Sequence, residues 1–127
     1  MRLVLTAAIF AGGLLFLVLG LQFLLMPASG GASFALSPEG AAGLAVLRAD
    51  FPALFFVGGG AMLWGAWKRN GDLLLVPAAL FGIALLGRFV SLAADGAWPG
   101  FWQPMLVEAA AVILTLVASR VLPHRIT

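Results

Sequence analysis

The sequence contains no cysteine and no tyrosine, and its only histidine is His124. Without cysteine the chain can form neither disulfides nor thiolate metal sites. One histidine in the C-terminal tail cannot supply a pair of haem ligands or a histidine-based metal site inside a helix bundle. The sequence therefore predicts a protein without a metal and without a cofactor.

Charged residues are also scarce. They make up 9% of the 127 residues, whereas a soluble domain has about 25%. Hydrophobic residues make up 63%, and the mean hydropathy is +1.12. This composition predicts an integral membrane protein with no separate soluble domain. The net charge of +2 comes from a few cations near the ends of apolar segments, which indicates membrane topology rather than a nucleic-acid partner.

Four apolar segments are long enough to cross a bilayer, which takes about 20 residues in a helix. They cover approximately residues 3–26, 44–67, 73–94 and 101–121. We expect an all-α, integral membrane four-helix bundle that forms a single membrane domain over residues 1–127. A secretory signal peptide is the rival interpretation of the first segment, but its apolar core is too long for one.

Local signals mark where these segments begin and end. Pro27 ends the first one, and Ser37 is expected to cap the helix that follows, with Pro38 in its first turn. Pro52 removes a backbone hydrogen bond, which predicts a kink or a lead-in turn at the membrane interface. The glycines at 58–60 indicate either a deformable helix or tight packing, and tight packing is favoured.

The cations indicate the orientation of the bundle. Five of them fall on one side of a four-span path, whereas the connections at 27–40 and 95–100 contain no Lys or Arg. By the positive-inside rule both termini are cytoplasmic, in the bacterial cytoplasmic (inner) membrane. The five cations are Arg2, Lys68, Arg69, Arg120 and Arg125. Trp64 and Trp67 then mark the inner interface, and Trp98 and Trp102 mark the outer one.

Several charged residues lie within the outer halves of the spans. Arg88 precedes Asp95 by seven residues and Glu108 follows Phe101 by seven, so both lie about 10 Å from the outer helix ends. Because an intramembrane charge is usually paired or faces an aqueous cavity, we expect Arg88 to pair with Glu108. Arg48, Asp50 and Gln22 enter the same half from the first two spans. The expected polar cluster comprises Gln22, Arg48, Asp50, Arg88, Asp95 and Glu108.

Three roles are open for this cluster. Its ion pairs could hold the bundle in register, with no ligand. It could instead bind a molecule with an anionic or hydrogen-bonding head and an apolar tail. In the third, a carboxylate carries protons in acid-base chemistry.

Four pieces of the sequence resemble a family of small bacterial membrane proteins that have four predicted helices and no assigned function. The pieces are GLAVLRADF at 43–51, the helix end GAW at 65–67, LGRFVSLAADG at 86–96, and Glu108. The family pattern in the second helix is Asn-x-Arg-Ala-Glu followed by glycines, whereas this chain has Val46, Asp50 and Pro52. The resemblance implies that Arg48, Asp50, Arg88, Asp95, Gly96 and Glu108 are family positions. It implies no reaction.

The sequence favours a non-catalytic role: a binding module or accessory subunit of the membrane. Its expected partners are membrane lipids, a lipophilic small molecule or a partner membrane protein. The first alternative is an acid-base enzyme on a lipophilic substrate, with Glu108 or Asp50 as the proton carrier. The second is a small proton-coupled transporter, which would need polar groups in the inner half, where the sequence has few beyond Thr6, Thr115 and Ser119.

Overall fold

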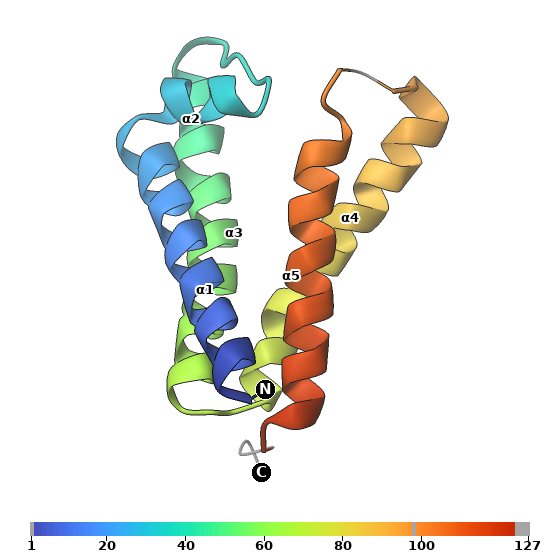
Figure 1. Cartoon of the computed structure of the whole chain (residues 1–127). Coiled ribbons are helices and arrows are strands. Elements are labelled where there is room, and N and C mark those ends of the chain that lie inside the picture. The colour runs from blue at the N-terminus through green and yellow to red at the C-terminus, as the bar shows by residue number, and fades with distance from the viewer. Residues whose placement is uncertain (1, 98, 124–127) are drawn as a thin grey trace.

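The computed structural model of the protein describes residues 2–97 and 99–123, and the regular structure in these residues is entirely helical (Figure 1). Four helices are long and apolar enough to cross a membrane, which confirms the predicted all-α fold with four candidate spans. The elements are α1 (Arg2–Leu25), α2 (Pro27–Ser33), α3 (Gly40–Trp67), the 3-10 turn η1 (Asp72–Leu74), α4 (Leu75–Asp95) and α5 (Trp102–Val121).

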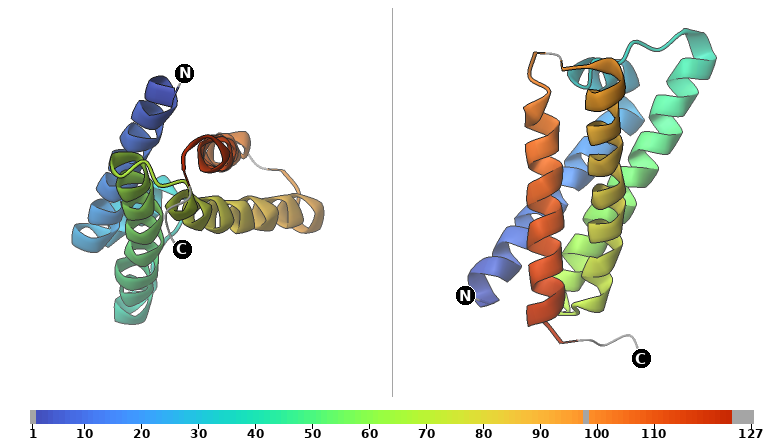
Figure 2. Two further views of the ribbon diagram at one scale, coloured as in Figure 1. Left: turned by 90° about the horizontal axis from the view of Figure 1, so that it is seen from below. Right: turned by 90° about the vertical axis from the view of Figure 1, so that its right-hand side faces the viewer.

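The four long helices form two antiparallel pairs, α1 with α3 and α4 with α5. The pairs meet at the end of the bundle where α1 begins and α5 ends, and they diverge toward the opposite end (Figure 1). Seen from below, α4 and α5 extend to one side of the crossed pair α1 and α3 (Figure 2). We call the first end the termini end and the opposite one, which carries α2 and the α4–α5 turn, the far end.

The termini end is closed by contacts between backbone groups. The backbone N–H of Gly71, in the turn between α3 and α4, donates a hydrogen bond of 2.8 Å to the carbonyl of Pro123. A Cβ atom on Gly71 would lie 2.6 Å from the carbonyl oxygen of Ser119, so only glycine fits without displacing α5. Asn70 is buried beside it, and its Oδ1 accepts a hydrogen bond from the backbone N–H of Asp72 at 3.0 Å.

Glycine also brings α1 and α3 together along their length. A Cβ atom on Gly13 would lie 2.8 Å from the carbonyl oxygen of Gly59, and one on Gly59 would lie equally close to the carbonyl oxygen of Gly13. Gly58, in contrast, faces the side chains of Leu80 and Phe81 on α4. Two of the three consecutive glycines therefore serve tight packing, the favoured interpretation.

Phenylalanine rings pack between α1 and α3 and against α4. The ring of Phe16 on α1 stacks on Phe81 of α4 with 4.5 Å between centroids, and it also stacks on Phe55 of α3. Toward the far end, Phe23 stacks on Phe51 at 4.8 Å. The rings contribute large apolar surfaces, and their offset and stacked pairing adds to the stability of the core.

The structure corrects three local expectations. The connection after α1 contains a helix, because Pro27, which cannot continue α1, is well suited to the first turn of α2. Ser37 does not cap α3, which begins at Gly40 with Glu39 before it and without a side-chain cap. Of the kink and the lead-in turn expected at Pro52, the lead-in turn is absent, since α3 is helical without a break from Gly40 to Trp67.

Candidate functional site

An ion pair connects α4 to α5 in the part of the bundle nearer the far end. Nε of Arg88 lies 2.6 Å from Oε1 of Glu108, and the two side chains are 31% and 11% exposed. The structure thus brings together the two residues that the sequence places at the same depth. The guanidinium has five N–H donors, and this contact uses the one on Nε.

Helix periodicity explains why these two side chains meet. Glu108 belongs to the buried stripe of α5, together with Ala111, Thr115 and Ala118, and residues spaced by three or four lie on one helix face. The small Ala111 lets α5 pack closely, so a carboxylate one turn earlier on the same face points at α4 rather than away from the bundle. Arg88 is the side chain of α4 that it meets.

An aromatic cavity adjoins the pair. It has a volume of about 260 Å³, and both Arg88 and Glu108 line it. Its wall is otherwise apolar and comes from α1, α3, α4 and α5, with Phe34 from the segment after α2. Five phenylalanines contribute to it: Phe16, Phe34, Phe51, Phe55 and Phe81.

Two further hollows also include Arg88 in their walls. One has a volume of about 610 Å³, and it shares Phe34, Pro104 and Val107 with the aromatic cavity. Ser33 and Gln103 add polar groups to it. The other, of about 180 Å³, lies between α4 and α5 and includes Ser91. The guanidinium of Arg88 therefore stands where an apolar cavity meets a wider and more polar hollow.

Arg48 and Asp50 do not join this site. Arg48 is exposed, and its Nε donates a hydrogen bond of 3.0 Å to the carbonyl of Leu24 in the last turn of α1, a turn whose carbonyls lack helical partners. Asp50 is exposed and forms no ion pair with another described residue. The expected cluster therefore does not bring Arg48 and Asp50 to Arg88 and Glu108, because α3 directs its two charged residues away from the cavity wall.

The other two residues of the expected cluster also lie outside the cavities. Gln22 is half-buried on α1 and has no side-chain hydrogen bond to the rest of the described chain. Asp95, the last residue of α4, is exposed and accepts a hydrogen bond from the Ser91 hydroxyl at 3.0 Å. After it Gly96 adopts φ +89°, a conformation that favours glycine, and the chain turns toward α5.

Sequence reasoning missed the contribution of the segments outside the spans. Phe34 lines both the aromatic cavity and the wider hollow of about 610 Å³, and Gln103 lies in the wall of the wider hollow. An aromatic residue in an otherwise small and polar connection was the available signal for Phe34. No signal pointed to Gln103, whose position depends on how α5 begins after Gly100.

The polar residues of α5 nearer the termini end bind their own helix. The Thr115 hydroxyl donates to the carbonyl of Ala111 at 2.6 Å, and the Ser119 hydroxyl donates to that of Leu116 at 2.7 Å. Both are buried. Among residues 2–97 and 99–123, no three histidine or acidic side chains gather in a way that could hold a metal ion.

Comparison of the chain with protein-family models, with curated proteins and with solved structures found no match. Its function is therefore inferred from the geometry of its own residues.

Proposed function

We propose that this protein is a multi-pass membrane protein that binds an amphiphilic molecule at the far end of its bundle. Its four apolar helices support insertion, since each is long enough to cross about 30 Å of hydrocarbon. The cations gathered at the termini end support an orientation with that end in the cytoplasm of a bacterium. The far end then lies in the outer leaflet of the cytoplasmic membrane.

The position of Arg88 carries this proposal. It lines the aromatic cavity and also the wider hollow with Ser33 and Gln103. An apolar tail in the cavity would place the attached head beside the guanidinium, whose Nη groups are available for hydrogen bonds or charge pairing. Glu108 holds Arg88 through Nε, which restricts the orientations that the guanidinium can take.

Burial of the pair strengthens its effect on a ligand. Charges interact more strongly away from bulk water, and a pair that is already neutral avoids the cost of leaving one charge alone inside an apolar wall. An anionic head would share Arg88 with Glu108, and a hydroxyl or carbonyl head would accept from Nη. The ligand class is therefore an amphiphile with an anionic or hydrogen-bonding head.

The test is mass spectrometry of amphiphiles that co-purify with the protein in mild detergent. We expect the parent protein to retain one, and Arg88→Met/Glu108→Met to lose it while remaining folded, because the double change removes both charges together. An unloaded parent protein, or a double variant that keeps the same molecule, would contradict the proposal. Glu108→Gln keeps the shape of the side chain, so a binding protein should keep most of its ligand in this variant.

A second pair of variants tests the aromatic cavity. Ala84 on α4 lines it, whereas Ala79 on the same helix is exposed and lies outside the cavity wall. Ala84→Leu should reduce ligand retention because the added carbons fill the cavity. Ala79→Leu adds the same volume and should have no effect. If both variants retain the ligand equally, the apolar tail of the ligand does not lie in the aromatic cavity.

A further inference from the structure

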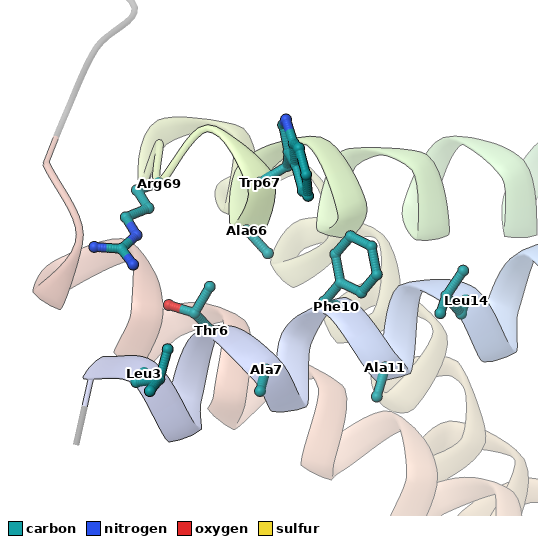
Figure 3. Close-up of a pocket in the computed structure, with 9 residues that line it drawn as sticks. All are labelled: Leu3, Thr6, Ala7, Phe10, Ala11, Leu14, Ala66, Trp67 and Arg69. Carbon is teal, nitrogen blue, oxygen red and sulfur yellow. The ribbon is translucent and has the colours of Figure 1, made fainter.

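A second hollow region lies at the termini end, away from Arg88. A groove of about 480 Å³ runs along α1 beside the end of α3. Its wall is apolar except for Thr6 and Arg69 (Figure 3). The remaining wall residues are Leu3, Ala7, Phe10, Ala11, Leu14, Ala66 and Trp67.

A smaller hollow of about 190 Å³ shares Thr6 and Arg69 with this groove, and Arg2 also lines it. Two guanidinium groups and one hydroxyl thus meet where the groove reaches the end of the bundle. No carboxylate among the described residues forms an ion pair with Arg2 or Arg69. Figure 3 shows Arg69 extending from the turn after α3 toward the side of α1 that carries Leu3 and Thr6.

The groove has the length of one leaflet. From Leu3 to Leu14 a helix rises about 16 Å, which is close to half of the roughly 30 Å hydrocarbon thickness. Ala7 and Ala11 form a low floor between larger side chains, and the ring of Trp67 stands beside Phe10 with 6.3 Å between centroids. Tryptophan favours the boundary between headgroups and acyl chains, and Trp67 is 75% exposed.

Charge complementarity identifies the occupant. An apolar groove that ends at two cations without acidic partners is suited to a molecule with an acyl chain and a negative head. Other cations, Lys68 and Arg120, lie on nearby helix ends, and juxtamembrane cations attract anionic lipids. We propose that this groove binds one anionic glycerophospholipid, with its phosphate between Arg2, Arg69 and Thr6 and one acyl chain over Ala7 and Ala11.

The proposal requires membrane insertion but not the ligand proposed for the far end. It is tested by native mass spectrometry of the full chain in detergent, titrated with phosphatidylglycerol and, separately, with phosphatidylcholine. We expect one phosphatidylglycerol to bind more tightly than phosphatidylcholine. Arg69→Gln should weaken phosphatidylglycerol binding about fivefold, as expected for one cation at a membrane surface.

Arg120→Gln is the matched charge control, since Arg120 is an exposed cation at the same end and lines neither hollow. This variant should bind as the parent does. If Arg120→Gln weakens phosphatidylglycerol binding as much as Arg69→Gln does, the lipid is attracted by the overall positive charge of this end, and the proposed site is wrong. Millimolar inorganic phosphate should not displace the lipid, and displacement by phosphate would show an ion site in place of a lipid site.

Ala11→Leu tests the acyl chain without changing a charge. It raises the floor of the groove, so phosphatidylglycerol should dissociate more readily, while Ala79→Leu on α4 should behave as the parent. A second protein copy in the groove would appear as a dimer that Ala11→Leu disrupts, and that outcome would overturn the proposal. Arg88→Met/Glu108→Met should leave phosphatidylglycerol binding intact, which separates this site from that of the far end.

Discussion

The termini end and the far end of this bundle are held together by different kinds of contact. At the termini end the backbone of Gly71 lies directly against α5, with an N–H to carbonyl bond of 2.8 Å to Pro123. At the far end the two helices of the second pair are joined by the side chains of Arg88 and Glu108. The cavities beside Arg88 lie where the helix pairs diverge.

This difference indicates how a small bundle can hold a cavity. At the termini end the backbones are in direct contact, with no flexible side chain between them. This contact fixes the angle between the helix pairs. The far end can then leave space between the pairs without losing the fold. One partly buried ion pair connects α4 to α5 there, and the same pair supplies the polar group that a ligand would meet.

Removal of one charge of the Arg88–Glu108 pair should lower the free energy of unfolding more than any other change considered below. Arg88→Met leaves the Glu108 carboxylate in an apolar wall without its partner. Breaking a fully buried pair costs about 3–5 kcal/mol, and because the Arg88 side chain is 31% exposed we expect a loss near the lower end of that range. Reversible unfolding in mixed micelles measures this loss.

The double variant Arg88→Met/Glu108→Met is its control. Because it leaves no lone charge, it should recover most of the stability. If Arg88→Met is as stable as the parent protein, the ion pair does not hold the far end together.

Gly71→Ala should destabilise the packing of the α3–α4 turn against α5 at the termini end. The new Cβ would lie 2.6 Å from the Ser119 carbonyl and 2.8 Å from that of Leu122, and two backbone groups cannot move aside as a flexible side chain can. Overpacking of this kind costs about 1–3 kcal/mol, and we expect the upper part of that range in the same unfolding assay.

Gly87→Ala, one residue before Arg88, provides the matching change toward the far end. Nothing lies within 4 Å of its added Cβ, and alanine favours a helix by about 1 kcal/mol over glycine. This variant should therefore be as stable as the parent or more stable. Equal destabilisation by the two alanines would mean that the ends do not differ in packing.

Gly13→Ala should have a somewhat smaller effect, because only one of the atoms that its Cβ would meet lies under 3.0 Å away, the Gly59 carbonyl oxygen at 2.8 Å. The other two, Cγ and the backbone N of Leu63, lie at 3.0 and 3.1 Å. We expect a loss of about 1–2 kcal/mol, measured by thermal unfolding. Gly60→Ala, whose Cβ meets nothing within 4 Å, should show no loss. A neutral Gly13→Ala would mean that the first helix pair is not held by close backbone contact.

Composition and hydropathy were sufficient to predict the four long helices, with starts and ends within a few residues of those observed. The equal depth of Arg88 and Glu108 followed from the helical rise, counted from the turn at Asp95 and Gly96. Such counting works because an α-helix rises about 1.5 Å per residue, so equal numbers of residues from one turn give equal heights.

What the sequence did not show depends on contacts between distant segments. The hydrogen bond of Arg48 goes to a backbone carbonyl of α1, and backbone carbonyls are present at every position, so none is singled out by sequence. Gly71 differs from the other glycines only through the α5 backbone beside it. Asp50 was expected in the site because it is charged and lies in the same half of its span as Arg88 does, but its direction on α3 depends on how that helix is rotated in the bundle.

The smallest predicted effect concerns these two charges of α3. Arg48→Gln removes an exposed hydrogen bond to the last turn of α1, which should cost less than about 1 kcal/mol because water can replace it. Asp50→Asn should cost less still, since its exposed carboxylate pairs with no other described residue. Both variants should keep the co-purifying amphiphile that Arg88→Met/Glu108→Met loses. Loss of the amphiphile in either one would extend the charged part of the far-end site from α4 and α5 to α3, and the division between one functional ion pair and two peripheral charges would then be wrong.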